Sequence, residues 1–159
     1  MPIDDSTFKS AMSHFASGVT VVTTQHDGKP YGMTVASFAS LSLHPPLVLV
    51  CIEKSVKSHD AIAGAGAFGV SILGANQQDV SGRFATKKIE DKFEGVATRT
   101  GDELGMPLID GAICQLECRV SEALPGGDHT IFVGEVVDAR TAAGEPLVYF
   151  RSGYREIRS

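Results

Sequence analysis

The chain has 159 residues, of which 43% are hydrophobic and 21% charged, a balance that is typical of a globular protein and excludes a disordered one, so we expect one domain over residues 1–159. The net charge is −5 and the longest basic run is Lys87–Lys88, so nucleic acids and anionic membranes are unfavourable partners. No apolar run approaches the roughly twenty residues that a membrane-spanning helix needs.

The N-terminal segment is polar and carries two aspartates within its first ten residues, unlike a signal peptide, so we expect a cytoplasmic protein. The same segment predicts a helix that ends near Gly18. Three residues can cap its start: Asp4, Asp5 and Ser6. Three apolar residues recur at helical spacing: Phe8, Met12 and Phe15. We expect this apolar stripe to pack in the core.

The next segments favour strands. Val19–Thr24 is rich in β-branched residues, and His26–Lys29 supplies a turn with the Asp-Gly pair that favours hairpins. A second strand is predicted over Pro30–Ser40. Leu47–Ile52 is continuously apolar and predicts a strand that is buried on both faces.

Two short helices are predicted to interrupt the sheet. The first covers Ser55–Ala63, and the second covers Asn76–Ala85 with Asn76 as its cap. Between them Phe68–Leu73 alternates as a strand does. The polar, glycine-containing segment Lys87–Leu108 predicts a loop that can include a short strand.

The C-terminal third again favours strands, at Ala112–Ala123, Thr130–Ala139 and Pro146–Arg151, with a turn at Pro125–Asp128. Six or more strands with only short helices predict a mainly β fold, a closed or split barrel. A Rossmann domain is disfavoured, because strands and helices do not alternate and no Gly-x-Gly-x-x-Gly motif follows a strand.

The sequence lacks the motifs of several common kinds of catalytic and metal-binding site. The sequence contains no His-Glu-x-x-His, Cys-x-x-Cys or histidine cluster, so we expect no metal site. It contains no Gly-x-Ser-x-Gly motif, so nucleophilic catalysis is unsupported. Of the three cysteines, Cys114 and Cys118 lie in one predicted strand, about 13 Å apart at roughly 3.3 Å per residue, which is too far for a disulfide. We expect reduced, packed thiols.

Two segments have the composition of ligand-binding strands and turns. Gly32–Phe38 combines small and hydroxylated residues, so a flat aromatic ligand can lie against its backbone while Thr34 and Ser37 bond the polar edge. An ordinary strand of small residues is the alternative. Glu53–Ser58 places a lysine and serines at a helix start, which is an anion site or simply a helix cap beside a surface lysine.

Two further segments add a cation and an imidazole. Ser81–Ala85 brings Arg83 beside an aromatic residue near a helix end. Gly126–His129 puts a histidine where a turn enters a strand, so its ring can face a cleft and bond an amide. A histidine that only stabilises its turn is the alternative.

Taken in order, these segments resemble the short flavin reductase family, the small reductase components of two-component flavin-dependent monooxygenases. The resemblance runs from Phe8 to Tyr154, and each motif is weak alone while the ordered set is specific. The matching segments are Phe15–Thr23 (FASGVTVVT), Gly32–Phe38 (GMTVASF), Ser40–Val48 (SLSLxPPLV), Ser55–Ser58 (SxxS), Ser81–Phe84 (SxRF), Gly127–Val136 (GDHxIxxGxV) and Pro146–Tyr154 (PLVYFRxGY).

The resemblance implies a Greek-key, FMN-binding split barrel that forms a homodimer, with flavin near the subunit interface. It also assigns residues to four parts of a site. Those along the isoalloxazine are Thr34, Val35, Ala36 and Ser37. Those that help to hold the flavin are Ser40, Cys51, Glu53 and Lys54. Those at the phosphate are Ser55, Ser58 and Arg83, with Phe84 and Ala85 close by. Those that meet the nicotinamide are His129, Gly153 and Tyr154.

The implied activity is hydride transfer from NADH or NADPH to FMN or FAD, with reduced flavin then supplied to a separate monooxygenase. The transfer needs stacked rings and excluded water rather than a strong protein base, which agrees with the missing triad and metal motifs. The family often has alanine where Val35 stands, which leaves the choice of flavin open.

Two alternatives remain at this point. A pyridoxamine-phosphate oxidase-like enzyme on a related barrel would be expected to place more basic residues about its cofactor. A non-catalytic flavin-binding or electron-transfer protein would leave His129 and Tyr154 without a nicotinamide to meet.

Overall fold

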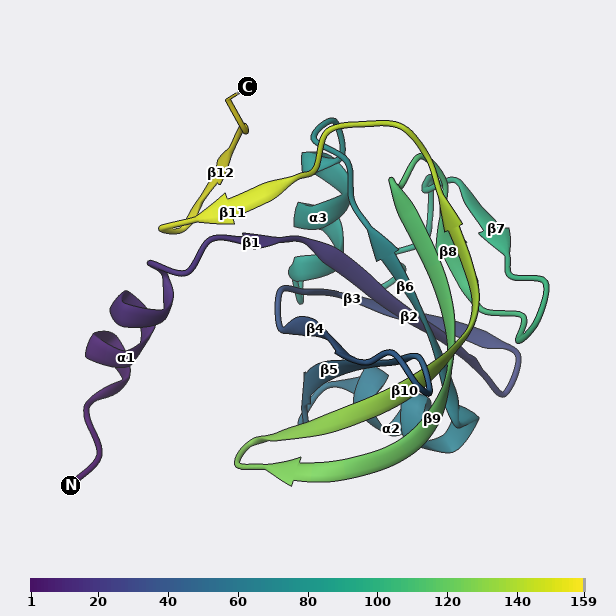
Figure 1. The fold of residues 1–159 in the computed structure, drawn as a ribbon, viewed down its shortest axis with the longest axis horizontal. Coiled ribbons are helices and arrows are strands. Elements are labelled where there is room, and N and C mark those ends of the chain that lie inside the picture. The colour runs from purple at the N-terminus through teal and green to yellow at the C-terminus, as the bar shows by residue number, and fades with distance from the viewer. Residues whose placement is uncertain (159) are drawn as a thin grey trace.

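The computed structural model describes residues 1–158 and is mainly β (Figure 1). The helices are α1 Asp5–Met12, α2 Lys57–Ala65 and α3 Gln78–Ala85. The strands are β1 Ser17–Gly18, β2 Thr20–His26, β3 Lys29–Val35, β4 Phe38–Ser42, β5 Leu47–Glu53, β6 Ala67–Ile72, β7 Thr98–Thr100, β8 Pro107–Ile109, β9 Cys114–Gly126, β10 His129–Thr141, β11 Val148–Phe150 and β12 Gly153–Arg155.

The main sheet has seven antiparallel strands in the order β3-β2-β6-β9-β10-β5-β4. Its two edge strands, β3 and β4, follow one another in the chain and are joined only by Ala36 and Ser37. The sheet therefore curls until its edges meet near this link. The predicted mainly β, split-barrel fold is confirmed.

The interior of the curled sheet is packed with aliphatic and aromatic side chains. Phe68 and Phe132 are fully buried there beside Val50 and Ile52. Gly134 has no side chain where β10 passes Phe68, and a Cβ at this position would lie 2.6 Å from Phe68 Cζ. This glycine is therefore required by close packing.

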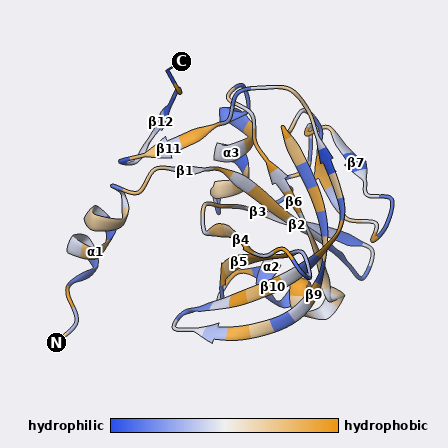
Figure 2. Ribbon diagram, in the orientation of Figure 1, coloured by the Kyte–Doolittle hydropathy of each residue, from blue (hydrophilic) through white to orange (hydrophobic). Residues whose placement is uncertain are grey.

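Helix α1 and the C-terminal strands lie outside the barrel, where β1, β11 and β12 form a small separate sheet (Figure 1). The Asp4 carboxylate caps α1 by accepting from Thr7 N at 2.8 Å, and this bond lowers the pKa of Asp4. No residue of α1 is buried, although Figure 2 shows apolar residues on this helix as well as in the barrel.

The prediction that the N-terminal apolar stripe packs in the core is wrong for the single chain. Phe8 and Met12 are 53% and 55% exposed, and Phe15 is 81% exposed. The helix precedes β1 and stands away from the barrel, so the described residues of the barrel do not cover the stripe (Figure 1).

Two strand predictions need correction. The predicted strand Pro30–Ser40 is two strands, because the chain turns at Ala36, whose carbonyl accepts from Phe38 N at 3.0 Å. The strand predicted to be buried on both faces, β5, alternates instead: Val48, Val50 and Ile52 are buried while the residues between them are only half-buried. One face of β5 is thus left partly open.

Helix and loop bounds also differ from prediction. Helix α3 begins after Gln77, so Asn76 is not its cap; the Gln77 side chain instead accepts from Gly74 N and donates to Asp110 O, both at 2.9 Å. The segment predicted as a loop that can include a short strand contains β7 and also the start of β8. The hairpin β9–β10 is longer than predicted, and its turn is reduced to Gly127 and Asp128.

The three cysteines are unpaired thiols. Burial raises the pKa of Cys114, and burial together with the charge of Glu117 raises the pKa of the fully buried Cys118 to about 12. Within residues 1–158, no helix has the length and apolarity needed to cross a membrane. The same residues contain no group of three or more His, Cys, Asp or Glu side chains arranged to hold a metal.

Candidate functional site

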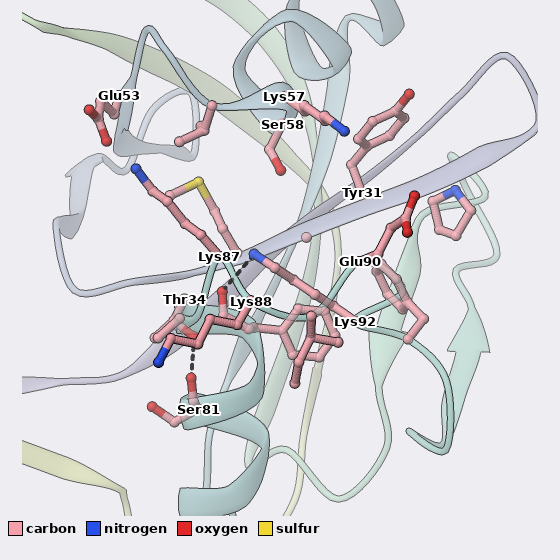
Figure 3. Close-up of a pocket in the computed structure, with 18 of the residues that line it drawn as sticks. Tyr31, Thr34, Glu53, Lys57, Ser58, Ser81, Lys87, Lys88, Glu90 and Lys92 are labelled. Carbon is pink, nitrogen blue, oxygen red and sulfur yellow. Dashed lines mark hydrogen bonds between the residues drawn. The ribbon is translucent and has the colours of Figure 1, made fainter.

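A cavity of about 1150 Å³ opens between β3, the start of α2, the end of α3 and the loop that follows α3 (Figure 3). Figure 3 shows Lys57 and Ser58 on one side of it and Thr34 and Ser81 on the other. Its size lies slightly above the range of roughly 300–1,000 Å³ that is usual for small-molecule sites. A second hollow, of about 450 Å³, is smaller and is described below with Arg83.

One wall of the cavity is apolar and aromatic. Phe84 and Phe93 meet edge to face with ring centroids 5.0 Å apart, and Gly32 of β3 lies against both rings. A Cβ on Gly32 would lie 2.9 Å from Phe84 Cε1 and 3.1 Å from Phe93 Cζ, so only glycine lets the strand approach this closely. Tyr149 and Tyr154 add a second aromatic pair. Such a wall suits a flat aromatic ligand.

The cavity also gathers most of the chain's lysines. Five of the seven line it: Lys29, Lys57, Lys87, Lys88 and Lys92. Three carboxylates share the lining, Glu53, Glu90 and Asp91, yet none of the ion pairs described for residues 1–158 involves a lysine. In a protein with a net charge of −5, this concentration of cations favours an anionic ligand.

Lys92 is half-buried, whereas the other four lysines that line the cavity are exposed. Its Nζ donates to Phe84 O at 3.1 Å, at the end of α3. Burial, followed by the charge of Lys87, lowers the pKa of Lys92. A bound anion would relieve both effects, because it would replace lost hydration and offset the neighbouring charge.

A short hydrogen-bond chain ties three elements together around the cavity. Thr34 Oγ1 of β3 donates to Ser81 O at 2.6 Å, and Ser81 Oγ lies 2.7 Å from the hydroxyl of Tyr154. Through these bonds the outlying strand β12 is attached to α3 and β3 at the cavity. Tyr154 is thereby held at the rim.

The structure brings half of the sequence-predicted site residues together in this cavity. They come from β3, the link to β4, the end of β5, the start of α2, α3 and β12. They are Thr34, Ala36, Glu53, Ser55, Ser58, Phe84, Ala85 and Tyr154. Their roles toward a ligand stay predictions.

The other predicted residues do not line the cavity. Val35 is buried in the core, because neighbouring residues of a strand point to opposite faces and Thr34 takes the cavity face. The Ser37 hydroxyl donates to Cys51 O at 3.1 Å, next to the cavity rather than in it. The remainder are Ser40, Cys51, Lys54, Arg83, His129 and Gly153.

His129 is the first residue of β10, paired in register with Glu53 at the end of β5. Its Nδ1 lies 2.7 Å from the Asp128 carboxylate, which can only accept, so Nδ1 donates and Nε2 has no partner among residues 1–158. This hydrogen bond, with the charge of His129, lowers the pKa of Asp128. The half-exposed ring is thus oriented by its neighbour at the Glu53 end of the cavity.

Arg83 faces away from the cavity. Its Nε donates to Lys92 O at 2.6 Å, and its second terminal nitrogen donates to Asp91 O at 2.8 Å. The side chain lines a second, smaller hollow of about 450 Å³ together with Asp79 and Glu94. The predicted contact between Arg83 and a phosphate stays a prediction, and the described guanidinium holds the loop instead.

Sequence reasoning missed the cationic lining. Lys29, Lys57 and the lysines of the loop after α3 come from three separate segments, so their convergence depends on the fold. The one local signal was the run Thr86–Phe93, which has three lysines in eight residues.

The chain is similar to known reductases along almost its whole length. The model of the flavin reductase like domain matches residues 12–158. The reductase component of a 4-nitrophenol 4-monooxygenase/4-nitrocatechol 2-monooxygenase from Rhodococcus opacus is 43% identical, over 96% of this chain and 81% of the relative. An NADH-dependent FAD reductase from Streptomyces globisporus is 40% identical, over 98% of this chain and 87% of the relative.

Solved structures agree with these matches. The C-1027 NADH:FAD oxidoreductase of Streptomyces globisporus has a TM-score of 0.94 and 38% identity, covering 100% of this chain and 96% of that one. A structure of the same oxidoreductase in complex with NAD and FAD fragments has a TM-score of 0.92 at 38% identity, covering 99% and 97%.

Proposed function

The chain belongs to the flavin reductase-like domain family, and from this we propose that its cavity binds a flavin while a reduced nicotinamide nucleotide delivers a hydride to it. The enzyme class is that of its relatives, an NAD(P)H:flavin oxidoreductase. The observation that carries the proposal is the cavity itself, in which five lysines meet an aromatic wall.

The cavity fits a flavin nucleotide in both of its chemical parts. The backbone of β3 at Gly32, packed on Phe93 and the buried Phe84, gives an apolar wall for a planar ring system, and Thr34 and Ala36 lie beside it. The serines at the start of α2, together with the lysines, supply hydroxyl donors and cations for phosphate. A bound flavin supplies the acceptor for a hydride from the nicotinamide ring.

In this proposal the protein contributes to hydride transfer by positioning the two rings and by excluding water from between them. Both rings have to be held at close approach, and the aromatic wall and the tyrosine rim exclude water from one side. We propose that His129 donates or accepts through its free Nε2 at the nicotinamide carboxamide. Asp128 supports this role because it fixes Nδ1 as the donor toward itself.

We further propose that the protein acts as a homodimer. The support is the apolar stripe formed by Phe8 and Met12 of α1 and by Phe15 just after it, which residues 1–158 leave exposed, and the partly open face of β5. Exposed apolar surface of this kind favours association. A monomer at micromolar concentration with full activity, measured by sedimentation, would contradict the dimer.

Two finer points belong to the same proposal. Several relatives are reductase components of monooxygenases, which supports a separate flavin-dependent oxygenase as the consumer of reduced flavin. The three unpaired thiols support a reducing compartment, the cytoplasm.

The decisive experiment is steady-state oxidation of NADH and NADPH by the purified protein, followed at 340 nm, with FMN or FAD added. We expect oxidation that depends on both flavin and protein. Flavin binding without nicotinamide oxidation would favour an electron-transfer protein. Oxidation of pyridoxamine phosphate in place of NADH would favour the related oxidase chemistry.

A further inference from the structure

The segment Thr86–Phe93, here called the lysine loop, follows α3 and covers one side of the cavity with Lys87, Lys88 and Lys92. The part of the loop around Asp91, here called its base, has more side-chain hydrogen bonds than the part around Lys87 and Lys88, here called its tip. At the base, the Asp91 carboxylate accepts from Phe93 N and Glu94 N at 3.1 and 3.2 Å. At the tip, the side-chain hydrogen bonds described for residues 1–158 include only one, from Lys88 N to Thr86 Oγ1.

The strongest attachment of the base comes from outside the cavity. Arg83 donates to the carbonyls of both Lys92 and Asp91, and it does so from the smaller hollow on the far side of the loop. Lys92 in turn donates to Phe84 O, next to Arg83 in the chain. Bonds from a charged donor contribute on the order of twice as much as neutral ones.

These contacts place Arg83 and Lys92 on opposite sides of one stretch of backbone. The Arg83 guanidinium bonds the carbonyls from the side of the smaller hollow, while Lys92 forms part of the lining of the cavity. If the carbonyls were released, the base of the loop would lose two of its bonds to α3. The lysines would then sample many positions, and a bound anion would have to restrict them at an entropic cost.

We propose that Arg83 is a positioning residue: it does not contact the ligand, and it holds the lysine loop so that Lys92 and its neighbours face the phosphate groups of the nucleotide in the cavity. The proposal rests on the proposed function for the identity of that ligand. It differs from a direct contact between Arg83 and phosphate, and the two roles give different results in the experiments below.

The first experiment measures the loop without any ligand. A lysine-specific endoproteinase is applied under native conditions to the wild type, to Arg83→Ala and to Arg140→Ala, and the cut sites are identified by mass spectrometry. We expect Arg83→Ala to be cut at Lys87 or Lys88 at least about tenfold faster, because opening the loop becomes easier by roughly 1.4 kcal/mol. Arg140 pairs with Asp102 outside the cavity, so its loss should leave the cutting rate unchanged.

An unchanged rate in Arg83→Ala would overturn the positioning role. The result does not depend on whether the protein reduces flavins, so it separates this inference from the proposed function. Thermal unfolding of both variants shows whether the faster cutting is local, since global destabilisation would expose all lysines together.

The second experiment measures flavin binding, with FAD as the probe and flavin fluorescence as the readout, in Arg83→Ala, Lys92→Met and the double variant. We expect each single variant to weaken binding by about tenfold, equal to roughly 1.4 kcal/mol, and the double variant to bind no more weakly than about twentyfold. Independent losses that multiply to about a hundredfold would show that Arg83 acts without Lys92, and would overturn the proposal.

Arg83→Lys distinguishes the two roles of the arginine and guards against a misfolded alanine variant. A direct contact with phosphate would be retained in part, because an ammonium group still binds phosphate as a point charge. A positioning role would not, because one ammonium group cannot match the fork that reaches both carbonyls. We expect Arg83→Lys to show a raised KM for flavin with a smaller change in kcat. Binding like that of the wild type would contradict the proposal, whereas absence of any FAD binding in the wild type would refute the proposed function instead.

Discussion

Apolar side chains are buried in the barrel but exposed on the outlying N-terminal helix α1. In the barrel, Phe68 and Phe132 are fully buried by strands of the same chain. On α1, Phe8 and Met12 have the same chemistry and a regular spacing, yet more than half of each side chain is exposed. The comparison teaches that an apolar pattern identifies a surface to be covered and does not identify the molecule that covers it. The following variants test this difference.

The largest effect is expected inside the barrel. Phe68→Ala should lower the free energy of unfolding by about 3–5 kcal/mol, because it removes a buried aromatic ring and leaves a cavity beside Gly134. Urea unfolding followed by circular dichroism measures it. Phe8→Ala is the matched control, and at a concentration where the protein is monomeric it should change the free energy of unfolding by less than about 0.5 kcal/mol. Equal losses would remove the contrast between the two regions.

The next effect tests what covers α1. Replacing Phe8 and Met12 together by serine should raise the dissociation constant of the proposed dimer by at least about a hundredfold, since each buried apolar side chain contributes on the order of 1.5 kcal/mol. Analytical ultracentrifugation over a dilution series measures the constant. Lys9→Ser, on the same helix, serves as the control. An unchanged constant would mean that the stripe is covered by something other than a second copy.

The third prediction concerns Glu117 of β9, a charged side chain that is buried like the apolar core but is held by hydrogen bonds. This fully buried carboxylate accepts from the backbone nitrogens of Glu103, Leu104 and Met106, at 2.9, 2.9 and 3.1 Å. Glu117→Gln should cost about 2 kcal/mol of unfolding free energy, because an amide presents donors where the loop also presents donors. Hydrogen exchange of the three amides should accelerate by at least tenfold. Protection like that of the wild type would show that the loop is held by its other contacts.

At the edge of the cavity, the expected effect is kinetic. His129→Ala should raise the KM for NADH or lower turnover by about tenfold, equal to roughly 1.4 kcal/mol, while flavin affinity changes little. The reason is lost alignment of the nicotinamide ring rather than lost binding surface. Steady-state kinetics with a melting curve of the same variant decide the matter. A lower melting temperature with normal NADH kinetics would make His129 a turn residue only.

The smallest effect concerns Asp128, which is fully exposed. Its pKa in the folded protein lies below the ordinary value of 3.8, so its stabilising bond to His129 is fully present above that value and is lost as the pH falls through the folded pKa. Asp128→Asn should therefore lower stability slightly at pH 7 and have no effect once the pH lies below the folded pKa. A carboxyl-carbon NMR titration measures the pKa directly. A value at or above 3.8 would contradict the described hydrogen bond.

The sequence predicted the barrel well because its signals are local. β-branched runs, the Asp27-Gly28 turn and the short helices all lie within a few residues of the structure that they favour. The bounds failed where a tertiary contact decides them, as at the turn of Ala36, which splits one predicted strand into two.

The candidate site was predictable only in part, for three physical reasons. Side chains alternate across a strand, so Thr34 lines the cavity while the Val35 side chain points into the core. The lysines converge from segments that are far apart in the chain, so no spacing rule could find them. Arg83 shows a third difficulty, because a charged residue beside a site can serve the backbone rather than the ligand.

The burial of Cys118 has a consequence for how long the proposed enzyme lasts. Free reduced flavin reacts with oxygen and forms hydrogen peroxide, which attacks thiolates far faster than thiols. Because burial raises the pKa of Cys118 to about 12, its sulfur stays in the less reactive thiol form at pH 7. Burial also denies peroxide access to the sulfur. The fold therefore protects this thiol chemically from a by-product of its own activity.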